Sequence, residues 1–330
     1  MKAWQIDGYD GIETLKLRDV PDPSPGEGQA LVRVHFAALN PADYYLAAGQ
    51  YPAKPAFPHI LGRDGIGTVE AVGPGVSDVA PGDLRLILRG DTGVDLPGTF
   101  AQRVVVPAVR LVERPEGWSQ QEASCASLVY LTAWQALMQF GPLPEGQTIL
   151  ITGASGGVGT ATLQLAKSLG HRVVTLSRSE EKRSRLREMG ADVTLDPSPP
   201  DLRKRIKEAL EGDRVDLIVD QVGGEEFNEV LNTLGMDGKI SCVGRVAGPV
   251  PSFNTANLFF RRIHIRGVAV YTYSATEARA VWGQIVQALS RTGAKPLVDS
   301  VFPFEELPGA FDRIRQGPMG KVVLEVAGER

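Results

Sequence analysis

The chain has 330 residues, enough for two domains that each bury a hydrophobic core. Hydrophobic residues make up 43% and charged residues 22%, with a net charge of −4, which is typical of a globular protein. No long block of Lys and Arg indicates a nucleic-acid or anionic-membrane partner, and no apolar run approaches the ~18 residues of a membrane span.

The first part of the chain, residues 1–118, is rich in turns and short apolar runs. Pro- and Gly-rich stretches such as PDPSPGEG and GPGVSDVAPGD separate the runs ALVRVHFAAL, GIGTVEAVG and FAQRVVV. Short strands divided by turn residues predict a β-rich domain here.

The second part, residues 119–271, alternates between strand and helix patterns. Ser119 is a candidate helix N-cap, with Glu122 three residues later. Strands are expected at 148–152, 172–177, 192–196, 215–223, 239–244 and 262–271, and helices at 158–170, 179–190, 201–212 and 225–235. Repeated βα units with apolar strands predict a parallel sheet covered by helices on both faces. In the last part, residues 272–330, we expect a helix over 277–293 and a strand over 321–326.

A glycine-rich turn joins the strand at 148–152 to the following helix. A doubly wound sheet places a dinucleotide pyrophosphate at this position, against the helix N-terminus. Gly156 allows the backbone to approach the phosphates, and Gly159 allows the helix to pack closely on its strand. Ala154 stands where the usual fingerprint has its first glycine, with Gly153 one place earlier. A tight strand–helix turn without a ligand is the alternative. The predicted pyrophosphate site consists of Gly153, Ala154, Ser155, Gly156, Gly157, Val158 and Gly159.

The end of the next strand indicates which dinucleotide binds. An NAD site has Asp or Glu there, to bond the ribose 2′-hydroxyl. This chain has Ser177, followed by Arg178 and, one helical turn later, Lys182. Without a carboxylate, these cations can pair with a 2′-phosphate, so the sequence favours NADPH over NADH. A solvated helix start with unrelated cations is the alternative.

These residues carry a resemblance to a known family. The stretches ALNPADYYLAAGQYP, ILGRDGIGTVEAVGPGV, SLVYLTAWQAL, ITGASGGVG, DLIVDQVGG and GKVVLEV resemble the zinc-independent quinone oxidoreductase branch of the medium-chain dehydrogenase/reductase superfamily. The resemblance implies that 1–118 and 272–330 form one GroES-like catalytic domain. A Rossmann-type NADPH-binding domain, 119–271, is then inserted between them.

The zinc-dependent branches differ from this chain at their metal ligands. Where they have Gly-His-Glu, this chain has Gly62, Arg63 and Asp64, and its only cysteines are Cys125 and Cys242. A guanidinium stays protonated and cannot ligate zinc, and two cysteines cannot build a four-thiolate site. We therefore expect no metal.

The resemblance also implies roles for particular residues. Asn40 and Thr132 would contact the nicotinamide, although turn chemistry at Asn40 and a helix-internal bond at Thr132 are alternatives. Tyr45 and Tyr51 would lie in the loop over the substrate, as hydrogen-bond or proton donors or simply as half-buried aromatics. Gly244 and Lys321 would lie near the cofactor.

The expected function is hydride transfer from NADPH to a quinone or related conjugated carbonyl, which delocalises the incoming charge without a Lewis acid. An alkenal or enoyl double-bond reductase and a non-catalytic NADPH-binding protein are the alternatives. We expect a cytoplasmic protein, because its few cysteines fit a reducing compartment. We also expect a homodimer formed at the strand 262–271, since apolar sheet edges are usually covered.

Overall fold

The computed structural model describes residues 1–249 and 254–327. The chain divides into two compact units. The first consists of Met1–Leu128, Tyr271–Gly283 and Lys295–Arg330, and the second of Val129–Val270 and Gln284–Ala294. The boundaries of these units differ from those of the expected domains, 1–118, 119–271 and 272–330. The expected domain boundaries remain a prediction.

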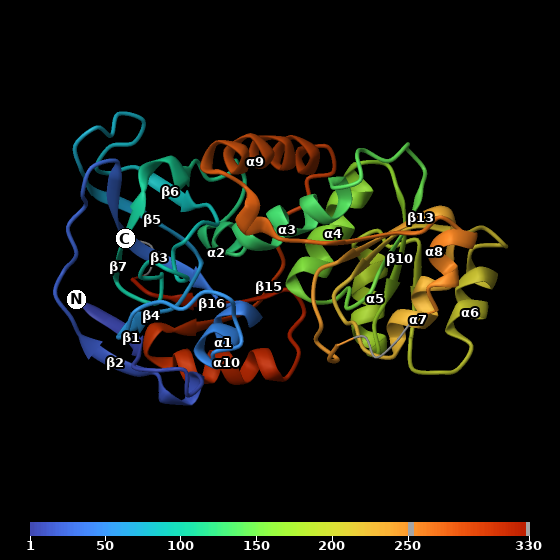
Figure 1. Ribbon diagram of the computed structural model, residues 1–330. Helices are drawn as coiled ribbons and strands as arrows, with labels where there is room; N and C mark the ends of the chain where they lie inside the picture. Colours follow the sequence, from blue (N-terminus) through green and yellow to red (C-terminus); the bar gives the residue numbers. More distant parts are fainter. Residues whose placement is uncertain (250–253, 328–330) are drawn as a thin grey trace. The chain divides into compact units, whose positions relative to one another are not determined.

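The first unit is built on two β-sheets (Figure 1). The smaller sheet has the strand order β2-β1-β4, from β1 (Lys2–Ile6), β2 (Lys16–Asp19) and β4 (His59–Ile60). The larger sheet has the order β15-β16-β3-β5-β6-β8, with β7 also paired to β3. Its strands are β3 (Gln29–Ala38), β5 (Asp64–Val72), β6 (Leu84–Ile87), β7 (Arg103–Pro107), β8 (Leu111–Val112), β15 (Val298–Pro303) and β16 (Lys321–Glu325).

The C-terminal segment completes this larger sheet. β16 pairs antiparallel with β3 and parallel with β15, so the tail and the N-terminal segment form one unit, as the resemblance implied. The helices of this unit include α1 (Pro41–Ala47), α2 (Gln120–Ser124) and α10 (Leu307–Arg315). The sequence patterns did not predict β15, α1 or α10.

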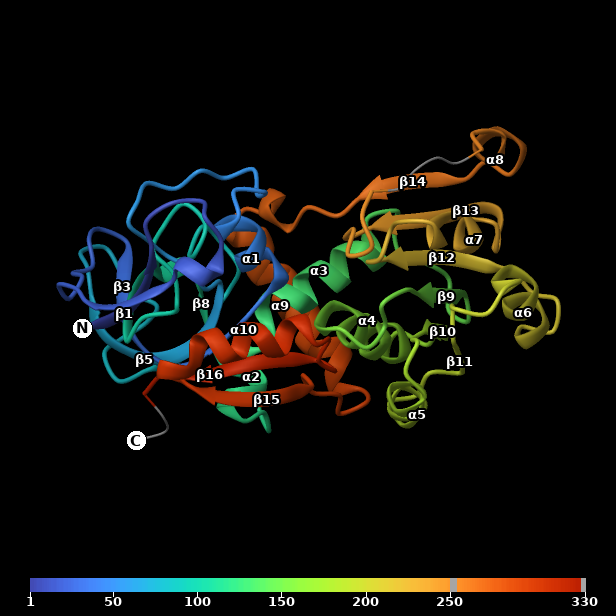
Figure 2. The same cartoon turned by 90° about the horizontal axis from the view of Figure 1, so that it is seen from below.

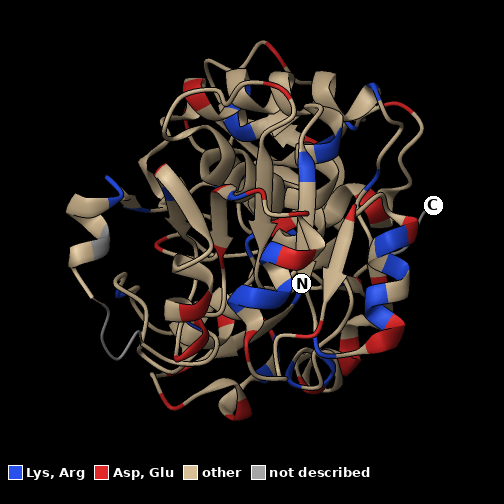
Figure 3. Ribbon diagram, turned by 90° about the vertical axis from the view of Figure 1, so that its right-hand side faces the viewer, with Lys and Arg blue, Asp and Glu red and all other residues tan. Residues whose placement is uncertain are grey.

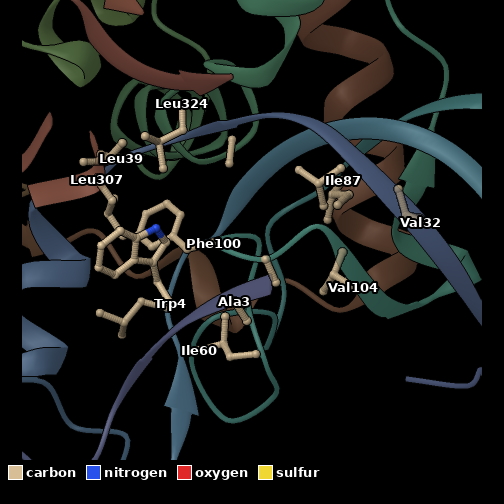
Figure 4. Packing of buried hydrophobic residues seen from close by; sticks show 14 of the residues in the cluster. Ala3, Trp4, Val32, Leu39, Ile60, Ile87, Phe100, Val104, Leu307 and Leu324 are labelled. Atoms are coloured by element: carbon tan, nitrogen blue, oxygen red, sulfur yellow. The ribbon is translucent and has the colours of Figure 1, made fainter. Parts of the chain in front are cut away.

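The core of the first unit brings together distant parts of the chain (Figure 4). Trp4 packs in this cluster and donates its ring N–H to the Phe304 carbonyl oxygen at 2.9 Å. Phe100 and Phe311 meet edge to face, with ring centroids 6.0 Å apart. Burial of such side chains stabilises the fold by roughly 1.5–3 kcal/mol each. Because Phe304 and Phe311 belong to this cluster, the C-terminal segment is part of the core.

The second unit contains a parallel sheet of strand order β11-β10-β9-β12-β13-β14, which Figure 2 shows side by side. Its strands are β9 (Thr148–Ile151), β10 (Arg172–Leu176), β11 (Val193–Leu195), β12 (Val215–Asp220), β13 (Leu234–Cys242) and β14 (His264–Gly267). The order reverses between β9 and β12, and right-handed crossovers leaving in opposite directions place their helices on opposite faces. This is the doubly wound fold expected from the βα pattern.

Most helices of this sheet begin and end close to the predicted positions. They are α4 (Gly157–Ser168), α5 (Glu180–Glu188), α6 (Leu202–Ala209) and α7 (Glu226–Leu231). The short helix α8 (Ala256–Phe260) was not predicted. Figure 3 shows basic and acidic residues interspersed along the helices of the described chain. In that part of the chain, no helix has the length and apolarity needed to cross a membrane.

Two elements differ from expectation, and a third agrees with it. The helix predicted after Ser119 is interrupted at Cys125 and continues as α3 (Ser127–Met138), although the Ser119–Glu122 capping box is present as predicted. The strand expected over 262–271 is only β14, because the chain turns into a short 3₁₀ helix at Val270–Thr272. The predicted C-terminal helix is α9 (Ala275–Ser290).

Candidate functional site

A buried polar cluster lies where three strand ends of the first unit meet. Asn40 follows β3 and precedes α1, Asp64 opens β5, and Lys321 opens β16. Because β3 is paired with both β5 and β16, the chain brings these three residues together. We call Asn40, Asp64 and Lys321 the strand-end cluster.

Every polar group of the strand-end cluster has an internal partner. Lys321 Nζ donates to Asn40 Oδ1 at 2.5 Å, to the Leu39 carbonyl at 2.7 Å and to Asp64 Oδ2 at 3.4 Å. These three contacts account for all the donors of an ammonium group. Asn40 Nδ2 donates to Asp64 Oδ2 at 2.9 Å, and its backbone N–H donates to Asp43 Oδ2 at 2.9 Å. The cluster therefore fixes Asn40 rigidly at the start of α1.

Arg63 stands where the zinc-dependent branches have a histidine, and it forms a buried ion pair. Its Nε lies 3.2 Å from Asp43 Oδ1, and both side chains are almost fully buried, with 1% and 0% exposure. Its Nη2 also donates to the Ala42 carbonyl at 3.0 Å. Burial raises the pKa of the Asp43 carboxyl, and the Arg63 charge opposes that rise. Arg63 thus holds the start of α1 onto the loop before β5.

The two predicted tyrosines have different surroundings. Tyr51 is half-buried, and the Arg63 guanidinium carbon lies 4.3 Å from its ring centroid. Tyr45, also half-buried, meets Tyr44 edge to face at 6.1 Å between centroids. Nearby, burial lowers the pKa of His59 to about 4, which leaves its imidazole neutral at pH 7.

In the second unit, the predicted pyrophosphate turn lies between β9 and α4. Gly153 has a φ of 58°, a left-handed conformation that favours glycine. A Cβ at Gly159 would lie 2.6 Å from the Ala154 backbone, so this position requires glycine for α4 to pack on the turn. A Cβ at Gly156, the N-cap of α4, would have only the Gly153 carbonyl near it, at 3.5 Å. The turn thus leaves room above the N-terminus of α4, where first-turn N–H groups lack helical partners.

A hydrogen-bond network that the sequence did not reveal supports this turn. Thr152 Oγ1 donates to Asp220 Oδ1 at 2.6 Å, which joins the ends of β9 and β12. Asp220 also accepts the backbone N–H of Gly223 at 3.1 Å. Because β9 and β12 flank the point where the strand order reverses, the network fixes the edge at which doubly wound sheets bind ligands.

The loop after β10 carries the residues predicted to bind a 2′-phosphate. Ser177 is buried, Arg178 is exposed, and Lys182 lies on α5 with partial exposure. Arg183, which the sequence analysis did not single out, donates Nη1 to the Ser177 carbonyl at 2.6 Å and to the Arg178 carbonyl at 3.0 Å. Arg183 therefore helps to fix the path of this loop. In the sequence, only its position next to Lys182 could have indicated this role.

The remaining predicted residues of the second unit are Gly244 and Thr132. A Cβ at Gly244, just after β13, would lie 2.9 Å from the Gln221 carbonyl oxygen, so this close approach requires glycine. Thr132 is buried on α3. Among the described residues, no group of three or more His, Cys, Asp and Glu side chains is arranged to hold a metal ion.

Comparison with known proteins agrees with this architecture. Residues 26–116 match the family model described as alcohol dehydrogenase GroES-like domain, and residues 157–291 match the one described as zinc-binding dehydrogenase. A quinone oxidoreductase of Rattus norvegicus is 28% identical over 98% of this chain and 97% of its own length.

Solved structures also match almost the whole chain. A crystal structure of an NAD-dependent alcohol dehydrogenase is 30% identical, with a TM-score of 0.90 over 99% of this chain and 100% of that chain. The chain belongs to the medium-chain dehydrogenase/reductase superfamily. A mycobacterial protein complexed with NADPH is 28% identical, with a TM-score of 0.87 over 99% of this chain and 100% of its own.

Within the medium-chain dehydrogenase/reductase superfamily, the chain is a quinone oxidoreductase-type, NAD(P)-binding oxidoreductase. The first unit contains the GroES-like domain, and the doubly wound sheet forms the second. The identity of the nicotinamide cofactor and the individual site residues remain predictions.

Proposed function

We propose that this protein transfers a hydride from NADPH to a quinone or a related conjugated carbonyl, without zinc. The observation that carries the proposal is Arg63, in the position of a zinc-ligating histidine. Its guanidinium cannot bind a metal, and its buried pair with Asp43 at 3.2 Å makes it part of the packed structure. An acceptor that delocalises charge needs no metal to polarise it.

The cofactor half of the proposal rests on the second unit. We infer that the turn Gly153–Gly159 binds the pyrophosphate, because it combines open space with the N-terminus of α4. Ser177, Arg178 and Lys182 bind the 2′-phosphate in this proposal. The mycobacterial relative complexed with NADPH supports this cofactor, whereas the relative described as an NAD-dependent alcohol dehydrogenase supports NADH as the second candidate.

The chain's own groups then orient the reactants. When bound, the nicotinamide supplies the hydride. Asn40, held by the strand-end cluster, and Thr132 orient the nicotinamide ring, with Gly244 and Lys321 near the cofactor. Tyr45 and Tyr51 are the candidate donors to the acceptor oxygen. Rigid placement of such groups lowers the barrier mainly by removing the entropy cost of alignment.

We also propose a homodimer and a cytoplasmic location. β14 is one of the two edge strands of the six-stranded sheet, and its residues are largely exposed. Pairing with a second copy would cover this edge. Cys125 is buried without a disulfide, and burial raises the pKa of its thiol to about 12. A free, unreactive thiol of this kind is consistent with a reducing compartment.

The test is NADPH and NADH consumption over a panel of quinones, enones and enoyl thioesters. We expect quinones to be reduced fastest, with NADPH as the better donor. Faster reduction of enones or enoyl thioesters would favour the double-bond reductase, and tight NADPH binding with no consumption would favour a non-catalytic protein. Stoichiometric zinc in elemental analysis of the purified protein would overturn the metal-free assignment.

A further inference from the structure

A second buried arginine lies beside Tyr51. Arg89 follows β6, has 4% exposure, and is fixed through its backbone. Its N–H donates to Ser127 Oγ at 2.5 Å, and its carbonyl accepts from Arg110 Nη1 at 2.7 Å. The guanidinium Nη1 of Arg89 is buried and has no hydrogen-bond partner among the described residues.

The charges around Tyr51 do not balance. Arg63 is paired with Asp43, and Lys321 with Asp64. Within the described chain, no carboxylate lies at ion-pair distance from Arg89. A buried guanidinium without a carboxylate at ion-pair distance is costly. Burial, then the nearby charge of Arg63, lowers the pKa of Arg89, and the more distant charge of Asp91 only partly opposes this. The guanidinium groups of Arg63 and Arg89 therefore stabilise a negative charge that forms beside them.

The Tyr51 hydroxyl is the group on which such a charge can form. Burial of the phenol opposes ionisation, but the charges of Arg63, which lies over the Tyr51 ring at 4.3 Å, and of Arg89 outweigh it and lower the pKa of Tyr51. Arg63 and Arg89 are the charged groups that act on the phenol. His59 adds no charge, because its imidazole is neutral at pH 7. Tyr51 is half-buried and so remains in reach of a ligand and of water, whereas both arginines are buried.

We propose that Tyr51 gives its proton to the hydride acceptor, and that Arg63 and Arg89 are positioning residues which stabilise the phenolate left behind. This inference rests on the proposed function, and it distinguishes Tyr51 from Tyr45. The acceptor gains two electrons and one proton as a hydride, and negative charge develops on its carbonyl oxygen. That oxygen takes the Tyr51 proton, so one O–H bond breaks and another forms. A proton from solution then restores the phenol, so each turnover takes up one hydride and one solvent proton.

The first test needs neither cofactor nor turnover. The ultraviolet absorbance of phenolate is titrated against pH in the parent protein and in Tyr51→Phe, and the difference isolates Tyr51. We expect Tyr51 to ionise below the ordinary tyrosine value of about 10. The midpoint should rise in Arg89→Met and stay low in Arg89→Lys. Arg85→Met is the matched control, since Arg85 lies on β6 and pairs with Asp83 instead.

The outcomes of the titration are distinct. An ordinary midpoint for Tyr51 in the parent, or one that Arg89→Met leaves unchanged, overturns the role of the arginines. If Arg85→Met raises the midpoint as much as Arg89→Met does, the effect is general and the proposal is again wrong.

The second test is kinetic. Loss of a general acid typically costs 10²–10⁴-fold in rate, so Tyr51→Phe should lower kcat by about 10²-fold or more and leave KM for the acceptor nearly unchanged. Tyr45→Phe should lower kcat much less, and the pH at which kcat falls should follow the Tyr51 midpoint in the arginine variants. A larger loss in Tyr45→Phe refutes Tyr51 as the donor. If the parent reduces no acceptor, the proposed function fails together with the proton-transfer step, whereas the titration still decides the electrostatic effect.

Discussion

The buried Arg63–Asp43 pair makes a quantitative prediction about stability. Replacing Arg63 by Met keeps much of the side-chain volume but removes the charge. The Asp43 carboxyl, with 0% exposure, then keeps its bond from the Asn40 backbone N–H at 2.9 Å and loses its counter-ion. Breaking a buried pair in this way typically costs 3–5 kcal/mol. We therefore expect Arg63→Met to lower the free energy of unfolding of the first unit by about 3–5 kcal/mol at pH 7.

The loss should depend on pH in a defined direction. Burial raises the pKa of Asp43, and the Arg63 charge opposes that rise. Without Arg63, the pKa of Asp43 in the folded state rises further above its unfolded value, so the folded variant binds the proton more tightly. Its stability relative to the parent must then fall as pH increases above about 3.9, the unfolded pKa of Asp. The deficit of Arg63→Met should accordingly be smaller in acid than at pH 7.

Tryptophan fluorescence during denaturant unfolding measures this loss. Three tryptophans lie in the first unit, namely Trp4, Trp118 and Trp282. Adding Asp43→Asn to Arg63→Met should restore most of the stability, because a neutral amide oxygen still accepts from Asn40.

The matched control is an exposed ion pair of the same kind. Arg18 Nη2 lies 2.6 Å from Asp7 Oδ2, and both side chains are in contact with solvent. Such pairs contribute little, so Arg18→Met should unfold close to the parent. A loss in Arg63→Met no larger than in Arg18→Met, or no recovery on adding Asp43→Asn, would refute the reasoning.

Four further predictions concern the cofactor and assembly. Arg178→Ala should weaken NADPH binding by roughly one to two decades, the equivalent of a charge-assisted bond of about 1.5–3 kcal/mol, and leave NADH binding little changed; equal weakening of both contradicts the 2′-phosphate assignment. Ser177→Asp should invert the preference, because a carboxylate repels phosphate and accepts from a free 2′-hydroxyl. Arg183→Met removes two anchors of the same loop and should weaken NADPH binding about tenfold, whereas Arg185→Met, exposed on the same helix, should not; calorimetric titration compares them. Light scattering at micromolar concentration should give the mass of a dimer, and a monomer mass would exclude pairing at β14.

The sequence alone determined the features that depend on local pattern. Alternating apolar strands and helices over 119–271 predicted the parallel sheet, because the βα period is written in neighbouring residues. The Ser119–Glu122 capping box was predictable for the same reason, since its bonds span three positions. The turn Gly153–Gly159 was visible because glycine at a tight turn has few substitutes.

Tertiary structure decided the polar contacts of the first unit. Lys321 and Asn40 are bonded although 281 positions separate them, and this contact exists only because β16 pairs with β3. Arg63 was identified in the sequence as a residue that cannot bind zinc, but its pair with Asp43 could not be read from the spacing. Arg89 gave no signal at all, since a lone arginine after a strand is usually solvated. Burial decides how much these contacts matter: a charge that is removed from water is costly unless a partner compensates it, and only the folded chain determines whether a group lies close enough to be that partner.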